Sequence, residues 1–153
     1  MWFPVSGFQL KTRNWNSDRE MVAHMKIRSF DQIEAWQLAR ELTKKIYKLT
    51  QKEKFCKDFG LKRQIQNAAG SAMHNIAEGF DSDTNAEFLR FLRYAKRSCS
   101  EVQSELYVAL DQKYISEAEF HDAFDYAGRT RATIRGFIKY LLSYKQKSPH
   151  DGL

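Results

Sequence analysis

The sequence predicts an all-α protein built as an antiparallel, up-down-up-down four-helix bundle, and three observations support that fold class. The chain has 153 residues, the length of one domain. Its Gly 7 and Pro 2 are too few for the many turns of a sandwich or barrel. Apolar residues recur at steps of three and four, the period of one helix face. We divide the chain into an irregular N-terminal extension over 1–25, a four-helix bundle over 26–145 and a frayed tail over 146–153.

The first two helices are predicted over about 31–52 and 60–78. Ser29 and Gln32 have the spacing of a capping box before the first helix. Gly79 suits a left-handed cap after the second helix, because glycine adopts that conformation without strain. The inward stripes consist of Ala35, Ala39, Leu42, Ile46 and Leu49, and of Leu61, Ile65, Ala68, Ala69, Ala72 and Ile76.

The last two helices each have a capping-box pattern followed by an unbroken heptad seam. Thr84 with Glu87 precedes the third helix, and Ser116 with Glu119 precedes the fourth. Each helix covers about 28 residues, or roughly 42 Å, and short connections force such helices to run antiparallel. The seams are Phe88, Leu92, Ala95, Cys99, Val102, Leu106 and Ala109, and then Ala123, Ala127, Thr130, Ile134, Phe137, Leu141 and Tyr144.

Aromatic residues beside these stripes exceed what one core requires. A wide core stripe with amphipathic edges would explain them, but aromatic enrichment is also typical of subunit contacts. We therefore predict an oligomer interface containing Trp36, Tyr47, Phe91, Tyr94, Tyr107, Phe124 and Tyr140.

Composition favours a cytoplasmic protein without a membrane span. Cys56 and Cys99 are far apart and suggest free thiols in a reducing compartment. No apolar run approaches the roughly 18 residues of a membrane helix, and we expect no signal peptide.

Motifs for catalysis or metal binding are missing from the sequence. Asp81, Asp83 and Asn85 begin a calcium-loop pattern, but Ala86 stands where that loop needs glycine and Leu92 where it needs a carboxylate. No histidine has metal-ligand spacing, and there is neither a nucleophile elbow nor a phosphate-binding glycine loop. We expect no enzyme activity, cofactor, metal or small-molecule substrate.

Polar side chains also share faces of the second and third helices. Paired carboxylates on facing helices could form an acid–base or di-metal site, but the latter needs Glu-x-x-His motifs that neither helix has. A polar network or a solvated face is the simpler interpretation, and whether Glu78 and Glu101 meet stays open. The residues are Ser71, Asn75 and Glu78, and Ser98, Glu101 and Glu105.

The net charge of +6 and the pI near 9.3 permit a polyanionic partner. Clusters of lysine and arginine occur at helical spacing, where they could bind phosphates or form ordinary solvated faces. We predict RNA or DNA binding through Lys44, Lys45, Lys48, Arg90, Arg93, Arg97, Arg131 and Arg135. The alternative is a scaffold whose oligomer presents helix faces to a partner protein.

Over residues 29–142 the chain resembles the 23S rRNA intervening-sequence (S23) protein family. The resemblance depends chiefly on N-I-A-E-G over 75–79 and E-F-L-R-F-L over 87–92, with Trp36, Tyr47 and Ser71. It implies a small bacterial bundle without enzymatic activity. It also implies a homopentamer, with basic relatives that associate with nucleic acid.

Two departures from that family pattern lie on the second helix. Gln66 and Asn67 stand where members often have basic residues, and Ala72 and Met73 where they often have proline. The first weakens the case for nucleic-acid contacts there, and the second removes an expected kink.

Overall fold

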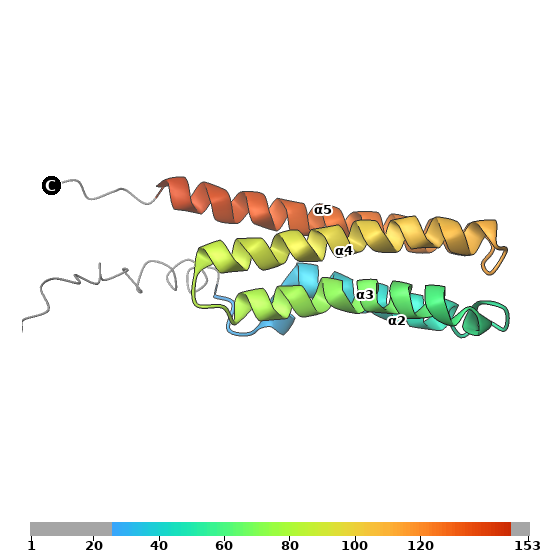
Figure 1. The fold of residues 1–153 in the computed structure, drawn as a ribbon. Helices are drawn as coiled ribbons and strands as arrows, with labels where there is room; N and C mark the ends of the chain where they lie inside the picture. Colours follow the sequence, from blue (N-terminus) through green and yellow to red (C-terminus); the bar gives the residue numbers. More distant parts are fainter. Residues whose placement is uncertain (1–25, 148–153) are drawn as a thin grey trace, which may run out of the picture.

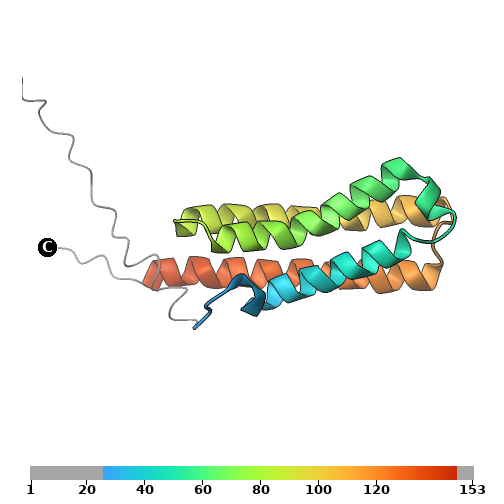
Figure 2. The same ribbon diagram turned by 90° about the horizontal axis from the view of Figure 1, so that it is seen from below.

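The computed structural model describes residues 26–147, with side chains up to Tyr144, and these residues form an all-α bundle. The elements are η1 Phe30–Gln32, α2 Glu34–Leu49, η2 Phe55–Lys57, α3 Phe59–Phe80, α4 Asn85–Asp111 and α5 Glu117–Lys147. Each long helix packs against the next, and α5 closes the bundle against α2 (Figures 1 and 2). The predicted fold class is confirmed. The extension over 1–25 and residues 148–153 of the predicted tail lie outside the described part.

The core follows the predicted stripes. All seven seam residues of α4, from Phe88 to Ala109, are buried. On α5, Ala127, Thr130 and Ile134 are fully buried, whereas Phe137 is half-buried at the edge. Small residues dominate α3, where Ala68, Ala69 and Ala72 allow close approach to its neighbours.

Two of the three predicted capping boxes cap helices in the structure. Thr84 Oγ1 accepts a hydrogen bond from the Glu87 N–H at 3.2 Å at the start of α4. At the start of α5, Ser116 Oγ accepts from the Glu119 N–H at 3.2 Å, and Glu119 Oε2 accepts from the Ser116 N–H at 2.9 Å. An unpredicted cap, Asp58, accepts from the Leu61 N–H at the start of α3.

The prediction for the first helix was wrong at its start. Residues 30–32 form a 3-10 turn and α2 begins at Glu34, because Ile33 is buried in the core and takes an extended backbone. Ser29 makes no cap hydrogen bond, and Gln32 Oε1 accepts from the Arg28 N–H at 2.8 Å instead. The helix also ends at Leu49, three residues before the predicted boundary.

Gly79 does not form the predicted left-handed cap. It lies inside α3, which continues to Phe80 and ends at Asp81 in a right-handed conformation. A Cβ atom on Gly79 would stand 2.7 Å from Phe88 Cδ2 and 2.8 Å from Phe91 Cβ. The glycine therefore serves the close approach of α3 and α4 rather than a turn.

The mostly polar segment 51–58, which follows the first helix, contributes one large aromatic side chain to the core. Phe55 is fully buried at the end of the bundle that holds the α2–α3 and α4–α5 connections (Figure 1). Its ring stacks on Tyr114 at 5.4 Å, and the Tyr114 hydroxyl donates to Asp58 Oδ2 at 3.1 Å. Lys113 has a left-handed φ of 59° in the adjoining turn, where its N–H bonds to the Leu110 carbonyl.

Candidate nucleic-acid interface

The lysines of α2 are mostly engaged by acidic side chains. Lys44 Nζ lies 2.6 Å from Glu41 Oε1, and this hydrogen bond lowers the pKa of Glu41. Lys45 reaches across to Asp122 of α5 at 2.8 Å and lies over the Tyr126 ring. Neither lysine is free to bind a phosphate without leaving its carboxylate.

A third lysine, Lys52, also pairs across the α2–α5 groove. Its Nζ lies 2.5 Å from Glu119 Oε2, and this bond lowers the pKa of the Glu119 carboxyl. Lys48 is the exception among the predicted α2 residues, since it is exposed and has no ion pair within residues 26–144.

A different group of cations lies on the surface of α4 and α5. Gln103 Nε2 donates to the Phe124 carbonyl at 3.2 Å, which shows that these two residues are level with each other in the antiparallel pair. Two turns from this contact, Lys96 on α4 and Arg131 on α5 reach the same level of the bundle. The α4–α5 basic face comprises Arg93, Lys96, Arg97, Arg131, Arg135 and Lys139.

No side chain of the α4–α5 basic face has an ion-pair partner among the described residues. Arg131 and Arg135 line a shallow hollow with Gly128 and Ala132, where small residues leave both guanidinium groups accessible. Arg90, by contrast, lies 3.9 Å from Glu87 and over the Phe91 ring. The structure thus divides the eight predicted residues into paired and unpaired cations.

Lys96 and Lys139 were not among those eight residues. The helical period places Lys139 four residues after Arg135, and Lys96 between Arg93 and Arg97 in sequence. The pairing register of α4 and α5 could have added them, because it brings the two clusters to one face.

The predicted oligomer-interface residues do not gather into one patch. Tyr47 lies beside α3, Tyr140 beside α2, and Phe91 against the α3–α4 contact at Gly79. Two pairs do meet: the ring centroids of Tyr107 and Phe124 are 5.5 Å apart, and those of Phe91 and Tyr94 are 6.1 Å apart. The seventh, Trp36, is half-buried and contacts Phe30. Tyr47, Tyr94, Tyr107 and Tyr140 are exposed.

The polar residues between α3 and α4 form a network, as the simpler interpretation predicted. Ser98 Oγ lies 3.1 Å from Ser71 Oγ across the two helices, and Asn75 Nδ2 donates to Ser71 Oγ at 2.9 Å. No hydrogen bond joins Glu78 to Glu101 in the described part of the chain.

Glu105 is the unusual member of this side of α4. Its side chain is 9% exposed, and its Oε2 is buried without a hydrogen-bond partner among residues 26–147. Burial, and then the neighbouring Glu101 carboxylate, raises the pKa of Glu105 to about 7. Its position on the helix was predicted from the sequence, but its burial was not.

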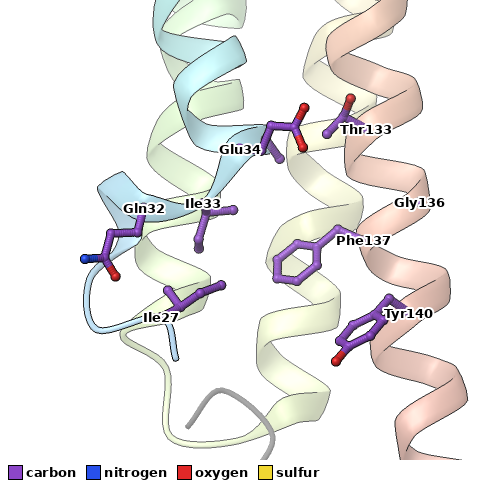
Figure 3. Close-up of a pocket in the computed structure, with 9 residues that line it drawn as sticks. Ile27, Gln32, Ile33, Glu34, Thr133, Gly136, Phe137 and Tyr140 are labelled. Carbon is purple, nitrogen blue, oxygen red and sulfur yellow. The ribbon is translucent and has the colours of Figure 1, made fainter. Parts of the chain in front are cut away.

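An apolar pocket of about 520 Å³ lies where the start of α2 faces α5 (Figure 3). Ile27 and Ile33 lie across the pocket from Phe137 and Tyr140 of α5, with Glu34 at the rim. The lining holds no nucleophile paired with a base. No group of three metal-ligating side chains occurs in the described residues.

The fold and its surface define a small antiparallel four-helix bundle whose last two helices carry a basic face without ion-pair partners in the described part of the chain. The sequence profile of the 23S rRNA-intervening sequence protein family matches residues 31–136, and the chain belongs to this family. No curated protein matches the sequence. Within residues 26–147, no helix is long and apolar enough to cross a membrane.

A solved structure shares the fold. It is a protein of unknown function from the S23 ribosomal protein family of Bacteroides thetaiotaomicron, with 21% sequence identity and a TM-score of 0.64. The similarity covers 69% of this chain and 98% of that one. The bundle is therefore the shared unit, and residues 1–25 lie outside the part matched by the family profile.

Proposed function

We propose that this chain is a non-enzymatic, cytoplasmic protein that assembles into a homopentamer and binds RNA or DNA through the α4–α5 basic face. The observation that carries the proposal is the absence of acid partners for that face within the described residues. Free guanidinium groups can bind phosphates without first breaking an ion pair. A pentamer would also carry a formal charge of about +30 and present five copies of the face.

The geometry of the face suits a phosphate backbone more than a base edge. The cations lie along two helices that run side by side, rather than at the tip of one helix entering a groove (Figure 1). We therefore expect binding with a strong salt dependence and little preference for sequence.

The test is fluorescence anisotropy with a labelled 23S rRNA fragment and a random-sequence DNA duplex of equal length, over a series of salt concentrations. The variant carries Arg97→Glu and Arg131→Glu. Its matched control carries Lys44→Glu and Lys57→Glu, which change the net charge equally at lysines that have acid partners.

If the proposal holds, the arginine variant loses most of its affinity and the control keeps much more. The slope of log K against log salt should fall by about 0.9 for each phosphate contact removed. Equal losses in both variants would indicate attraction by net charge alone. Undetectable binding of the wild-type protein to both probes would refute the proposal.

The scaffold alternative is supported by the exposed aromatic residues of α4, because aromatic side chains are enriched at protein contacts. Tyr94 and Tyr107 are 41% and 52% exposed. Affinity purification with nuclease treatment separates the two functions. A partner protein retained after nuclease treatment, together with absent nucleic-acid binding, would favour the scaffold.

A further inference from the structure

One oxygen of the Glu105 carboxylate, Oε2, is buried and has no hydrogen-bond partner among the residues that the structure describes. The Glu105 side chain is 9% exposed. Buried polar groups in native proteins nearly always have a hydrogen-bond partner. An ionised carboxylate in such a position is unfavourable until a donor reaches it. The missing donor is therefore expected from outside the described residues of the protomer.

The helices around Glu105 offer it no cation. On α4, the neighbour one turn earlier is Glu101, a like charge that raises the pKa of Glu105 further. On α3, the Ser71–Ser98 contact sets the antiparallel register, so the residue seven positions earlier, Gln64, lies at the level of Glu105. Gln64 is uncharged and exposed. Gln103 lies on the side of α4 that faces α5. The cations of the α4–α5 basic face lie toward that side of α4, away from Glu105.

Exposed apolar side chains extend along the same stripe of α4. Tyr94, Glu101, Glu105 and Val108 follow one another at steps of seven, four and three residues, so they share one side of the helix. Tyr94 is 41% exposed and Val108 is 44% exposed. Tyrosine is among the residues that are enriched at protein interfaces, so this stripe of α4 is suited to a protein contact.

We propose that the α3–α4 face, centred on Glu105, is the surface on which a second copy of this chain docks, with an arginine or lysine of that copy donating to the Glu105 carboxylate. The inference deepens the proposed function, because it assigns one contact of the proposed oligomer. Charge complementarity favours a second copy as the occupant, because such a copy presents exposed cations that have no ion-pair partner among the described residues, Lys48 on α2 among them. Rings also use heterologous contacts, in which two different faces of the same protomer meet.

Proton linkage gives this contact a characteristic pH dependence. In the free protomer Glu105 is protonated below about pH 7. A cation from the second copy stabilises the ionised form, so docking releases a proton and strengthens as pH rises. Assembly should therefore weaken when pH falls from 8 to 6.

The test is the mass of the full chain by size-exclusion chromatography with light scattering, across a concentration series at pH 8 and pH 6. Glu105→Gln keeps the size of the side chain and removes its charge. Glu117→Gln, at an exposed position on α5, is the matched control. Circular dichroism confirms that each variant retains its helices.

We expect the wild-type protein to exceed 18.0 kDa at pH 8, with Glu105→Gln raising the dissociation constant about tenfold or more. The variant should also lose the pH dependence, whereas Glu117→Gln should behave like the wild type. Tyr94→Ala should weaken assembly at both pH values, because its contribution is apolar.

Two results would overturn the inference in distinguishable ways. An oligomer whose mass responds neither to Glu105→Gln nor to pH refutes this contact and leaves the proposed oligomer standing. An oligomer mass that responds neither to Glu105→Gln nor to pH is also expected if the face binds residues 1–25 or an unrelated basic protein. That result therefore counts against a second copy as the occupant of this face. A wild-type protein that stays at 18.0 kDa under all conditions refutes the proposed oligomer and this contact together.

Discussion

Replacing Gly79 by alanine tests the close approach of α3 and α4. Alanine favours a helix interior over glycine by about 1 kcal/mol, so an unobstructed site would gain stability. At Gly79 the new Cβ would stand 2.7 Å from Phe88 Cδ2 and 2.8 Å from Phe91 Cβ. The second contact is with a carbon fixed to the α4 backbone, which cannot rotate away. Overpacking of this kind costs about 1–3 kcal/mol. We take the upper part of that range, which leaves a net loss of about 1–2 kcal/mol.

Gly136 on α5 supplies the matched control for this substitution. A Cβ there would meet no atom within 4 Å, and the residue is exposed. Gly136→Ala should therefore stabilise the protein by about 1 kcal/mol. The two alanine variants should differ by about 2–3 kcal/mol in the free energy of unfolding, from urea denaturation followed by circular dichroism. Equal stabilisation by both substitutions would refute the interpretation of Gly79 as a packing residue.

Three further outcomes follow from the caps, the thiols and the buried carboxylate. Ser116→Ala should destabilise the protein by about 1 kcal/mol in thermal unfolding, whereas Ser29→Ala should be nearly neutral, because only the first serine caps a helix. Burial raises the pKa of the Cys99 thiol to about 12, so iodoacetamide should label the half-exposed Cys56 alone in the folded protein; rapid labelling of both would contradict the buried position. In single protomers at high dilution, Glu105 binds its proton up to about pH 7 when folded and releases it near 4.5 when unfolded. Stability should therefore fall as pH rises from 4.5 to 7, and a Glu105→Gln variant without this loss would bear out the assignment.

The sequence was most informative where one face of a helix decides its position. The α4 seam repeats without interruption, and every residue from Phe88 to Ala109 on that seam is buried. Caps at Thr84 and Ser116 were predictable because their partners lie three residues away. Local chemistry alone specifies such features, so they do not depend on the rest of the fold.

Features that depend on contacts between helices were not predictable in the same way. Gly79 has the sequence context of a cap, and only the positions of Phe88 and Phe91 on the next helix explain its role. Ile33 interrupts the first helix because burying its side chain outweighs the capping pattern at Ser29. These outcomes are set by tertiary packing, which local propensity does not describe.

The candidate interface illustrates the same limit for charge. The helical period identified Lys45 and Arg131 equally well as members of basic clusters. The structure pairs Lys45 with Asp122, which is 77 residues away, and leaves Arg131 without an ion pair within the described residues. The charges on each helix can be counted from the sequence, but the packing of the helices determines which of these charges are neutralised by another helix.

The ion pairs that join the first helix, and the turn that follows it, to the last helix have a consequence for the order of folding. Lys52 and Glu119 are separated by 67 residues, whereas α3 and α4 are joined by a short turn and pack closely. Closing the longer loop costs more chain entropy, so α2 should dock on α5 after the α3–α4 hairpin has formed. Contacts made late in folding act mainly on the unfolding rate. The contacts between α2 and α5 would then determine mainly the unfolding rate of a protomer, and so its lifetime in the folded state, with little effect on its folding rate.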